Sequence, residues 1–226
     1  MTFKNGIPCP KNLPAHVHSD LLSFDLFYKG VPVIAEAGTS IYQDGVMRNL
    51  ERSAKSHNLL QLAPYSINDD KKGIMWIEPV EIWGSFRAAR KANPTFRLAK
   101  KLKNKTYLIS GSNDTHKRFG AFHQRTIKLM KDKSENLKIE FIDHIICQKR
   151  MWVRQSWHIG PSYDKSLLKD LVSQSENKFK FENHWEKTMY AIGFGKRVQR
   201  SSLFIKGILD PGEHIIKYDL IIKAKL

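Results

Sequence analysis

The sequence has few cysteines and no long apolar run. Its 226 residues include two cysteines, Cys9 and Cys147, which are too few for a disulfide scaffold and do not form a metal-binding cluster. We expect both thiols to be free or buried. No stretch approaches the roughly 18 apolar residues needed to cross a bilayer. Met1–Leu13 also lacks the apolar segment of a secretion signal. The sequence therefore predicts neither a disulfide-rich protein nor a membrane-spanning one.

Acidic residues are also scarce. The chain has 22 Asp and Glu against 38 Lys and Arg, which gives a net charge of +16. A charge of this size favours an anionic partner, which could be a nucleic acid, an acidic polysaccharide or an anionic membrane face. Nucleic acid is the least favoured, because no recognisable aromatic nucleic-acid motif accompanies the charge. The segment Lys91–Lys105 holds six Lys or Arg residues and is either a solvated strand edge or part of an anion-facing surface.

Helical periodicity is weak, whereas short segments of alternating or β-branched residues predict strands. Leu22–Phe27 and Val31–Ala35 lie on either side of a Lys29-Gly30 turn signal, which predicts a hairpin. Thr126–Met130 and Lys138–Ile145 both alternate and are separated by a polar run, which predicts a second hairpin with a longer loop.

The C-terminal part continues the same pattern. A turn at Asp210-Pro211-Gly212 precedes the strand-like Ile215–Ile222, and Ser166–Ser175 is the best helical candidate. Many short strands with regular turn signals predict an all-β fold, a large antiparallel β-sandwich. The chain is 41% hydrophobic and 11% aromatic, enough for a real core. We expect residues 14–226 to form one sandwich domain, preceded by a leader of residues 1–13.

Polar residues that suit chemistry gather in the N-terminal third. His16 and His18 are two apart on an extended segment and would project to the same face. Glu36 follows an apolar run, and His57 lies in a later polar segment. Two histidines and one carboxylate from different segments could form a zinc site with a position left open. The alternative is that these histidines only make structural hydrogen bonds.

These residues belong to a longer pattern between residues 14 and 92. Its elements, in order, are His16-Val17-His18-Ser19-Asp20, Leu22-Ser23-Phe24-Asp25-Leu26, Glu36-Ala37-Gly38-Thr39 with Tyr42, Arg52-Ser53 to His57-Asn58, and Trp83-Gly84-Ser85-Phe86-Arg87. Together they resemble the C-terminal β-sandwich of the heparinase II/III-like polysaccharide lyases. The order and the spacing match jointly, which makes the resemblance more specific than any single element. The rest of the chain fits as a continuing sandwich.

The resemblance implies a role for each site residue. His16 looks like the active-site histidine of the family, and His18, Glu36 and His57 look like the ligands of a zinc ion that is mainly structural. Glu36 stands where the family usually has Asp. Its side chain is one methylene longer, so the backbone must retreat for a carboxylate oxygen to lie about 2.0–2.2 Å from zinc.

Lyases of this kind cleave uronic-acid glycosides by β-elimination. The reaction needs the substrate carboxylate neutralised, a base for the adjacent proton and an acid for the leaving oxygen. The resemblance implies that His16 donates a hydrogen bond to the carboxylate or exchanges the proton. Arg87 and Arg90 would bind carboxylate or sulfate groups, or they are exposed strand charges. Arg52 could bind the same groups or brace the zinc loop.

Family members carry a helical (α/α) toroid before the sandwich, and the toroid supplies the catalytic Tyr. Only about fifteen residues precede the His-x-His pair here. We therefore expect the chain either to be a truncated or split product or to work with a separate toroid domain or chain, and to lack full lyase activity alone. Family members with a signal are exported to the periplasm. The alternative function is a non-catalytic module that binds acidic polysaccharide or assists surface-polysaccharide assembly.

Two further groups have alternative interpretations. Three tryptophans are sugar-stacking platforms or, by default, core residues: Trp152, Trp157 and Trp185. His123 and Arg125 flank Gln124 on a predicted strand and face the same side, where a structural role is favoured over substrate contact.

Overall fold

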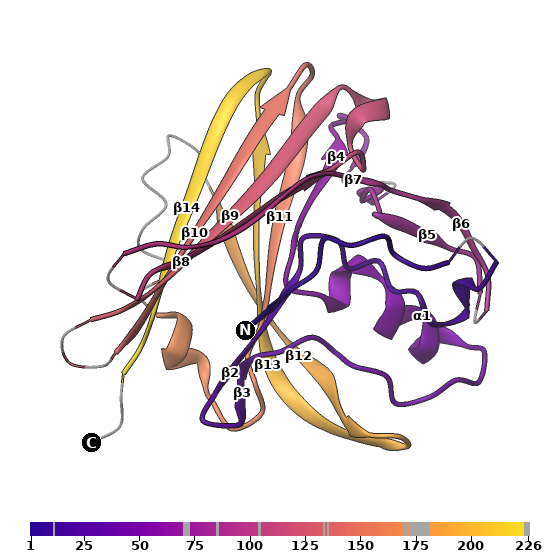
Figure 1. The fold of residues 1–226 in the computed structure, drawn as a ribbon. Helices are drawn as coiled ribbons and strands as arrows, with labels where there is room; N and C mark the ends of the chain where they lie inside the picture. Colours follow the sequence, from indigo (N-terminus) through magenta and orange to yellow (C-terminus); the bar gives the residue numbers. More distant parts are fainter. Residues whose placement is uncertain are drawn as a thin grey trace.

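The structure of the protein is a computed structural model. It describes residues 1–10, 12–69, 73–84, 86–103, 105–132, 134, 136–169, 171 and 181–223. Most of it is antiparallel β-strand (Figure 1). The strands are β1 (Thr2–Phe3), β2 (Phe24–Tyr28), β3 (Val31–Ile34), β4 (Leu60–Pro64), β5 (Val80–Ile82), β6 (Ala88–Lys91), β7 (Pro94–Lys101), β8 (Tyr107–Asn113), β9 (Ala121–Lys131), β10 (Leu137–Cys147), β11 (Met151–His158), β12 (Glu182–Gly193), β13 (Lys196–Leu209) and β14 (Gly212–Ile222). The helices are α1 (Val46–Arg52) and the short 3₁₀ turns η1 (Pro14–His16), η2 (Ala54–Ser56), η3 (Lys117–Phe119) and η4 (Lys165–Leu168).

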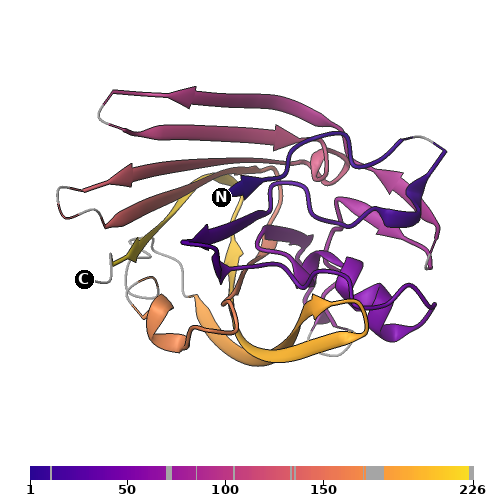
Figure 2. The same ribbon diagram turned by 60° about the horizontal axis from the view of Figure 1, so that its bottom comes forward.

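Two large sheets form the layers of a sandwich, as the alternating strands predicted. One has five strands in the order β14-β10-β9-β8-β7, and the other has four in the order β12-β13-β11-β4. Figure 2 shows the two layers, with the helix α1 at one end between them. Two smaller sheets, β1-β2-β3 and β5-β6, complete the described part of the chain.

The core fills the space between the two large sheets. Trp157 of β11 is fully buried, and the centre of its ring lies 5.0 Å from that of Phe141 on β10 and 5.5 Å from that of Tyr218 on β14. Phe24 of β2 stacks on Phe141 at 4.7 Å. Aromatic contacts of this kind add to the hydrophobic effect of burial. Trp157 is thus the core residue that the default interpretation predicted, while Trp152 and Trp185 are half-buried.

The predicted hairpins are confirmed. Strand β2 pairs with β3 across a turn at Lys29 and Gly30, both of which have positive φ. Strand β9 pairs with β10 along its whole length, from Ala121 opposite Cys147 to Lys131 opposite Leu137. Side chains alternate between core and solvent along both strands, and this half-burial is what produced the alternating sequence.

The remaining expectations have mixed outcomes. Both cysteines are free, as predicted. Of the helical candidate Ser166–Ser175, the structure has the turn η4 up to Leu168, and residues 170 and 172–175 lie outside the described residues. The α-helix α1 was not predicted. No described helix has the length and apolar character needed to cross a membrane.

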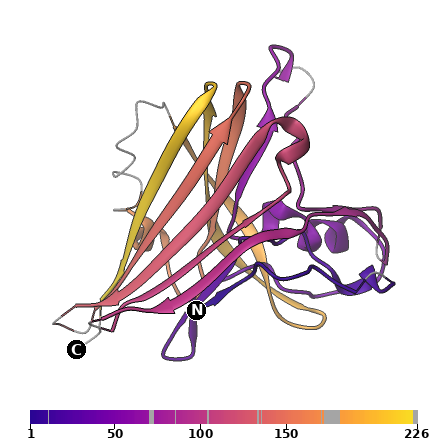
Figure 3. The same ribbon diagram turned by 45° about the horizontal axis from the view of Figure 1, so that its top comes forward.

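The first residues of the chain take part in the fold. Strand β1 pairs with β2, with Thr2 opposite Asp25 and Phe3 opposite Phe24. The Asn5 side chain donates a hydrogen bond to the Phe96 carbonyl at 2.8 Å. In Figure 3, this N-terminal segment runs toward the end of the sandwich that holds α1 and the loops around it.

Candidate functional site

His16 lies at the end of the molecule that holds α1. It closes the turn η1, and the next residue, Val17, is buried and anchors the turn. The His16 ring is exposed to solvent and meets the Tyr42 ring edge-on, with the ring centres 5.3 Å apart. The predicted active-site histidine therefore presents its imidazole at the surface beside an aromatic ring.

Arg52 holds the loop that carries His16. Its Nε donates a hydrogen bond to the Val17 carbonyl at 2.8 Å, and its Nη2 donates to the Pro14 carbonyl at 3.2 Å. Its Nη1 donates to the carbonyl of Gly84 at 2.5 Å. Arg52 is fully buried, so these bonds form in a low dielectric where they are strong. Of the two roles considered for Arg52, the geometry favours bracing.

Arg48 and Phe194 join this surface and were missed by the sequence interpretation. Arg48 is fully buried, donates to the Ala15 carbonyl at 3.0 Å and lies 4.9 Å from the Tyr42 ring centre. Phe194, at the tip of the β12–β13 hairpin, is exposed, and its ring lies 5.4 Å from that of Tyr42. The spacing of Arg48 and Arg52, four residues apart, was the one available signal, because such pairs share a helix face. We call the exposed His16, Tyr42 and Phe194, with the buried Arg48 beneath Tyr42, the His16 surface.

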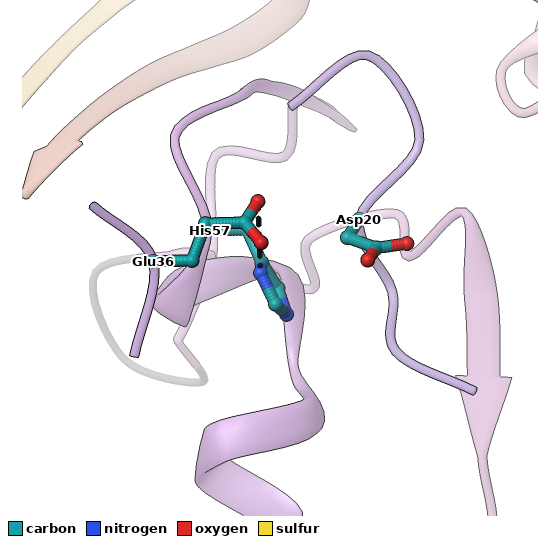
Figure 4. Close-up of side chains that lie close together, drawn as sticks. All are labelled: Asp20, Glu36 and His57. Atoms are coloured by element: carbon teal, nitrogen blue, oxygen red, sulfur yellow. Dashed lines mark ion pairs between the residues drawn. The ribbon is translucent and has the colours of Figure 1, made fainter. Parts of the chain in front are cut away.

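A second group of polar side chains comes from three segments of the N-terminal third of the chain. Ligand atoms of Asp20, Glu36 and His57 all lie within 4.8 Å of one another (Figure 4). The Glu36 carboxylate points at the imidazole of His57, with Oε1 3.2 Å from Nδ1. Glu36 and His57 are buried, and Asp20 is half-buried. The structure thus brings together two of the three predicted zinc ligands, and we call this group the acidic cluster.

The third residue of the acidic cluster is Asp20 and not His18. The His18 ring centre lies 5.3 Å from that of His57, but its Nε2 is 3.3 Å from the hydroxyl of Thr39. Asp20 was visible as the last residue of the His-x-His-x-Asp element but was given no role. Its contribution depends on how the chain turns before β2, which residue spacing does not reveal.

A lysine side chain reaches into the acidic cluster. The Lys4 ammonium lies 3.0 Å from Oδ2 of Asp20 and also donates a hydrogen bond to Oε2 of Glu36. Backbone bonds fix its position, because Lys4 N donates to the Ser23 carbonyl at 2.9 Å and Leu22 N donates to the Lys4 carbonyl. Nothing in the spacing of Lys4 from these residues predicted the contact.

The cluster shifts the pKa values of its members. Burial by itself raises the pKa of Glu36, but His57 and Lys4 outweigh burial and hold it below its usual range. Burial likewise lowers the pKa of His57, but the Glu36 carboxylate outweighs it and the net shift is upward. Burial, together with the charges of His57, Lys4 and Arg48, lowers the pKa of His18 to about 3. His18 is therefore neutral near pH 7, which is the form of histidine that binds metals.

The donors of the acidic cluster fit a zinc ion. Carboxylate oxygens and imidazole nitrogens are the ligands that zinc uses beside thiolate. His57 is 1% exposed, and its Nε2 has no hydrogen-bond partner among the described residues. A buried ring nitrogen without a partner is costly in a purely structural role and suits a metal ligand.

The two predicted substrate-binding arginines differ in their surroundings. Arg90 donates hydrogen bonds to the carbonyls of Thr115 at 3.3 Å and Asp114 at 3.1 Å, so its guanidinium is partly used within the fold. Arg87 is exposed in the loop between β5 and β6. The same loop contains Gly84, the residue that Arg52 ties to the His16 turn.

His123 and Arg125 lie in the core and have the structural role that was favoured. His123 Nε2 is 2.8 Å from Oδ1 of Asp143. Arg125 binds both oxygens of that carboxylate and donates to the carbonyls of Leu22 and Asn58. This network joins the five-stranded sheet to the segments around the acidic cluster.

Comparison with known proteins gives a consistent result. A family model described as heparinase II/III-like, C-terminal, matches residues 1–217. The solved heparan sulfate lyase HepC from Pedobacter heparinus is similar in fold, with a TM-score of 0.64 and 18% identity over 93% of this chain and 32% of that one. A structure of the heparinase III BT4657 gene product gives a TM-score of 0.64 and 16% identity over 98% of this chain and 32% of that one. No curated protein sequence matches the chain. The chain spans about a third of the length of these solved structures.

Proposed function

The chain belongs to the heparinase II/III-like C-terminal family, and from this premise we propose that it is the sandwich part of a polysaccharide lyase. In this proposal it acts on acidic, uronic-acid-containing glycans by β-elimination. The observation that carries the proposal is the family match over residues 1–217, supported by the exposed ring of His16, which the sequence resemblance assigns as the active-site histidine.

The His16 surface supplies groups suited to this chemistry. The exposed imidazole of His16 can donate a hydrogen bond to a uronate carboxylate or exchange a proton with the sugar. Tyr42 and Phe194 are exposed rings beside it and offer apolar faces to a sugar ring. Arg48 lies beneath Tyr42 and places a positive charge under the site. Arg87, exposed in a loop tied to the same turn, is the stronger of the two predicted arginines for binding carboxylate or sulfate groups.

The acidic cluster is proposed to hold a structural zinc ion. Asp20, Glu36 and His57 would be its ligands. The family resemblance implies His18 as a further ligand, and the His18 ring lies beside that of His57. Bound zinc would cross-link the segments before β2, after β3 and after η2, which also position the His16 turn. Support for this comes from the donor types and from the unpartnered Nε2 of His57.

The basic strand β7 and its neighbours favour an acidic glycan as the partner. Residues 87–113 contain eight Lys or Arg and no Asp or Glu. Among the described residues, Arg90 is the one of the eight with an acidic partner within 4 Å, at 4.0 Å from Asp114, and the other seven have none: Arg87, Lys91, Arg97, Lys100, Lys101, Lys103 and Lys105. Strand β7 is exposed along nearly its whole length at the edge of the five-stranded sheet. Unpaired charges of one sign on an exposed strand suit a linear polyanion.

Complete activity is proposed to need a helical toroid domain, on the same or a separate chain. The solved relatives are about three times longer than this chain, and the cleft of a two-domain lyase needs groups from both sides. The alternative function is a module that binds acidic glycans without cleaving them. The uncompensated charge of β7 favours this alternative equally, so turnover has to decide.

The test compares the wild type with a His16→Ala variant and an exposed control, His184→Ala. Each is mixed with heparan sulfate or alginate, with and without the helical domain of a related lyase, and unsaturated uronate is followed by ultraviolet absorbance. We expect turnover only with the helical domain and about a 10²–10⁴-fold loss in His16→Ala, the range for a general acid–base group. The control should match the wild type.

No product from any acidic glycan, even with the helical domain present, would overturn the lyase proposal. If glycan binding, measured by calorimetry, is then equal in wild type and His16→Ala, the binding module replaces it. Loss of all glycan affinity at moderate salt in every variant would count against the binding module.

A further inference from the structure

The acidic cluster already contains a cation. We propose that Lys4 is a built-in counter-ion of Asp20 and Glu36 and that its ammonium competes with zinc for this site. The inference rests on the proposed zinc site and adds to it an internal competitor that regulates metal loading.

The ammonium and a metal ion would draw on the same two carboxylates. Lys4 Nζ lies 3.0 Å from Oδ2 of Asp20 and is hydrogen-bonded to Oε2 of Glu36, so it bridges the two carboxylates. Zinc would bind through carboxylate oxygens of Asp20 and Glu36, whose negative charge the ammonium already neutralises. Two cations at this pair of carboxylates would repel each other, so each weakens the binding of the other.

The backbone fixes Lys4, but its side chain has a way out. The backbone N–H of Lys4 donates a hydrogen bond to the Ser23 carbonyl, and the Lys4 carbonyl accepts one from Leu22 N. Both bonds lie next to the β1–β2 pair. Its side chain is 38% exposed, whereas that of Glu36 is 6% exposed. The ammonium can therefore rotate into solvent while the strand stays paired. A metal can displace Lys4 without opening the core.

The charges explain why the site needs a cation at all. Asp20 and Glu36 place two carboxylates together, and Glu36 is buried. Without Lys4 or a metal, the buried Glu36 carboxylate would keep only His57 as a cationic neighbour in the cluster, and the loss of one such partner is destabilising. Lys4 thus keeps the cluster folded when no metal is bound, and it weakens metal binding by the same interaction.

The experiment measures zinc binding and thermal stability in three proteins. These are the wild type, Lys4→Met and the control Lys100→Met, which removes an exposed lysine of β7. Zinc affinity is obtained by competition with a chromogenic chelator, and melting is followed with zinc and with EDTA. We expect Lys4→Met to bind about one zinc per chain, about tenfold or more tightly than the wild type, because the competing ammonium is gone. It should melt below the wild type in EDTA and gain more from zinc. Lys100→Met should match the wild type.

The outcomes separate this inference from the zinc proposal. If the wild type binds zinc and Lys4→Met binds it no more tightly, Lys4 is not a competitor, but the zinc site stands. If neither protein binds zinc, both proposals fall. If Lys4→Met folds only with zinc present, Lys4→Arg provides the second test, because it retains a cation and should keep the wild-type affinity. A zinc affinity in Lys4→Arg as high as in Lys4→Met would overturn the inference.

Discussion

Asp143 is the central residue of the buried polar network. Its carboxylate is fully buried and accepts hydrogen bonds from His123 Nε2 and Arg125 Nε at 2.8 Å and from Arg125 Nη2 at 2.9 Å. Burial raises the pKa of Asp143, but Arg125 and His123 outweigh burial and lower it to about 2. The carboxylate is therefore charged at neutral pH, and the guanidinium of Arg125 depends on it.

Asp143→Asn should destabilise the protein by about 3–5 kcal/mol, because it leaves the Arg125 charge buried without a counter-ion. Glu140→Gln is the matched control three residues earlier on β10. Glu140 is partnered by Lys128 at 3.8 Å near the surface, and its loss should cost about 1 kcal/mol or less. Urea unfolding followed by tryptophan fluorescence gives both free energies. Equal losses in the two variants would contradict the network's role.

His116 predicts how stability depends on pH. Burial, with the nearby charges of His123 and Arg90, lowers the pKa of His116 from an ordinary value of 6.5 to about 3. The unfolded chain therefore takes up this proton first as pH falls. Stability from His116 is fully present above pH 6.5 and is lost as pH drops from there toward 3.

Replacing His116 by Gln should flatten the fall in the free energy of unfolding below pH 6.5 by up to about 1.4 kcal/mol per pH unit. Urea unfolding across this range measures the slope in wild type and variant. His184→Gln, at an exposed histidine, is the control and should keep the wild-type slope. A His116→Gln slope as steep as the wild type would exclude His116 as the source.

At the scale of elements, the end of β11, a strand of the four-stranded sheet, is hydrogen-bonded to the segment of β3 in the small N-terminal sheet. Gly160, just beyond β11, donates a backbone hydrogen bond to the Val33 carbonyl at 2.8 Å. A Cβ at this position would lie 1.9 Å from the backbone oxygen of Pro32 in β3. Only glycine allows the two backbones to approach this closely.

Gly160→Ala should destabilise the protein by about 1–3 kcal/mol or more, because the contact is with backbone that cannot rotate away. Gly193→Ala is the control, since a Cβ there meets nothing within 4 Å. Thermal melting of both variants provides the comparison. A Gly160→Ala protein as stable as Gly193→Ala would show that β3 can move away from β11.

Strands and helices were predictable from the sequence where buried side chains recur at a regular spacing along the chain. The β9–β10 hairpin shows in the alternation because each strand has one buried face. The helix α1 does not show, because the residues that it buries are Arg48, Glu51 and Arg52 and form no apolar stripe. Its burial depends on hydrogen bonds to distant carbonyls, which a hydrophobic pattern cannot reveal.

At the scale of the whole molecule, the site is assembled from segments that are far apart in sequence. His16, Glu36 and His57 could be predicted because each lies in a recognisable motif of the family. Lys4 and Arg48 could not, because their contacts depend on the β1–β2 pairing and on the packing of α1. Family resemblance thus pointed to the candidate site, and the three-dimensional structure was needed to find the contacts of Lys4 and of Arg48.

Strand β7 has a consequence for how copies of the protein associate. In the part of the chain that the structure describes, it ends the five-stranded sheet and pairs with β8 alone. Charge repulsion from three basic residues would disfavour the addition of a second copy there: Arg97, Lys100 and Lys101. A bound polyanion would cancel this repulsion and hold several copies along one polymer. Near the ratio at which polymer and protein charges balance, the mixture should turn cloudy, and excess polymer should clear it by spreading the copies apart. The solubility of the protein would then depend on the amount of glycan present.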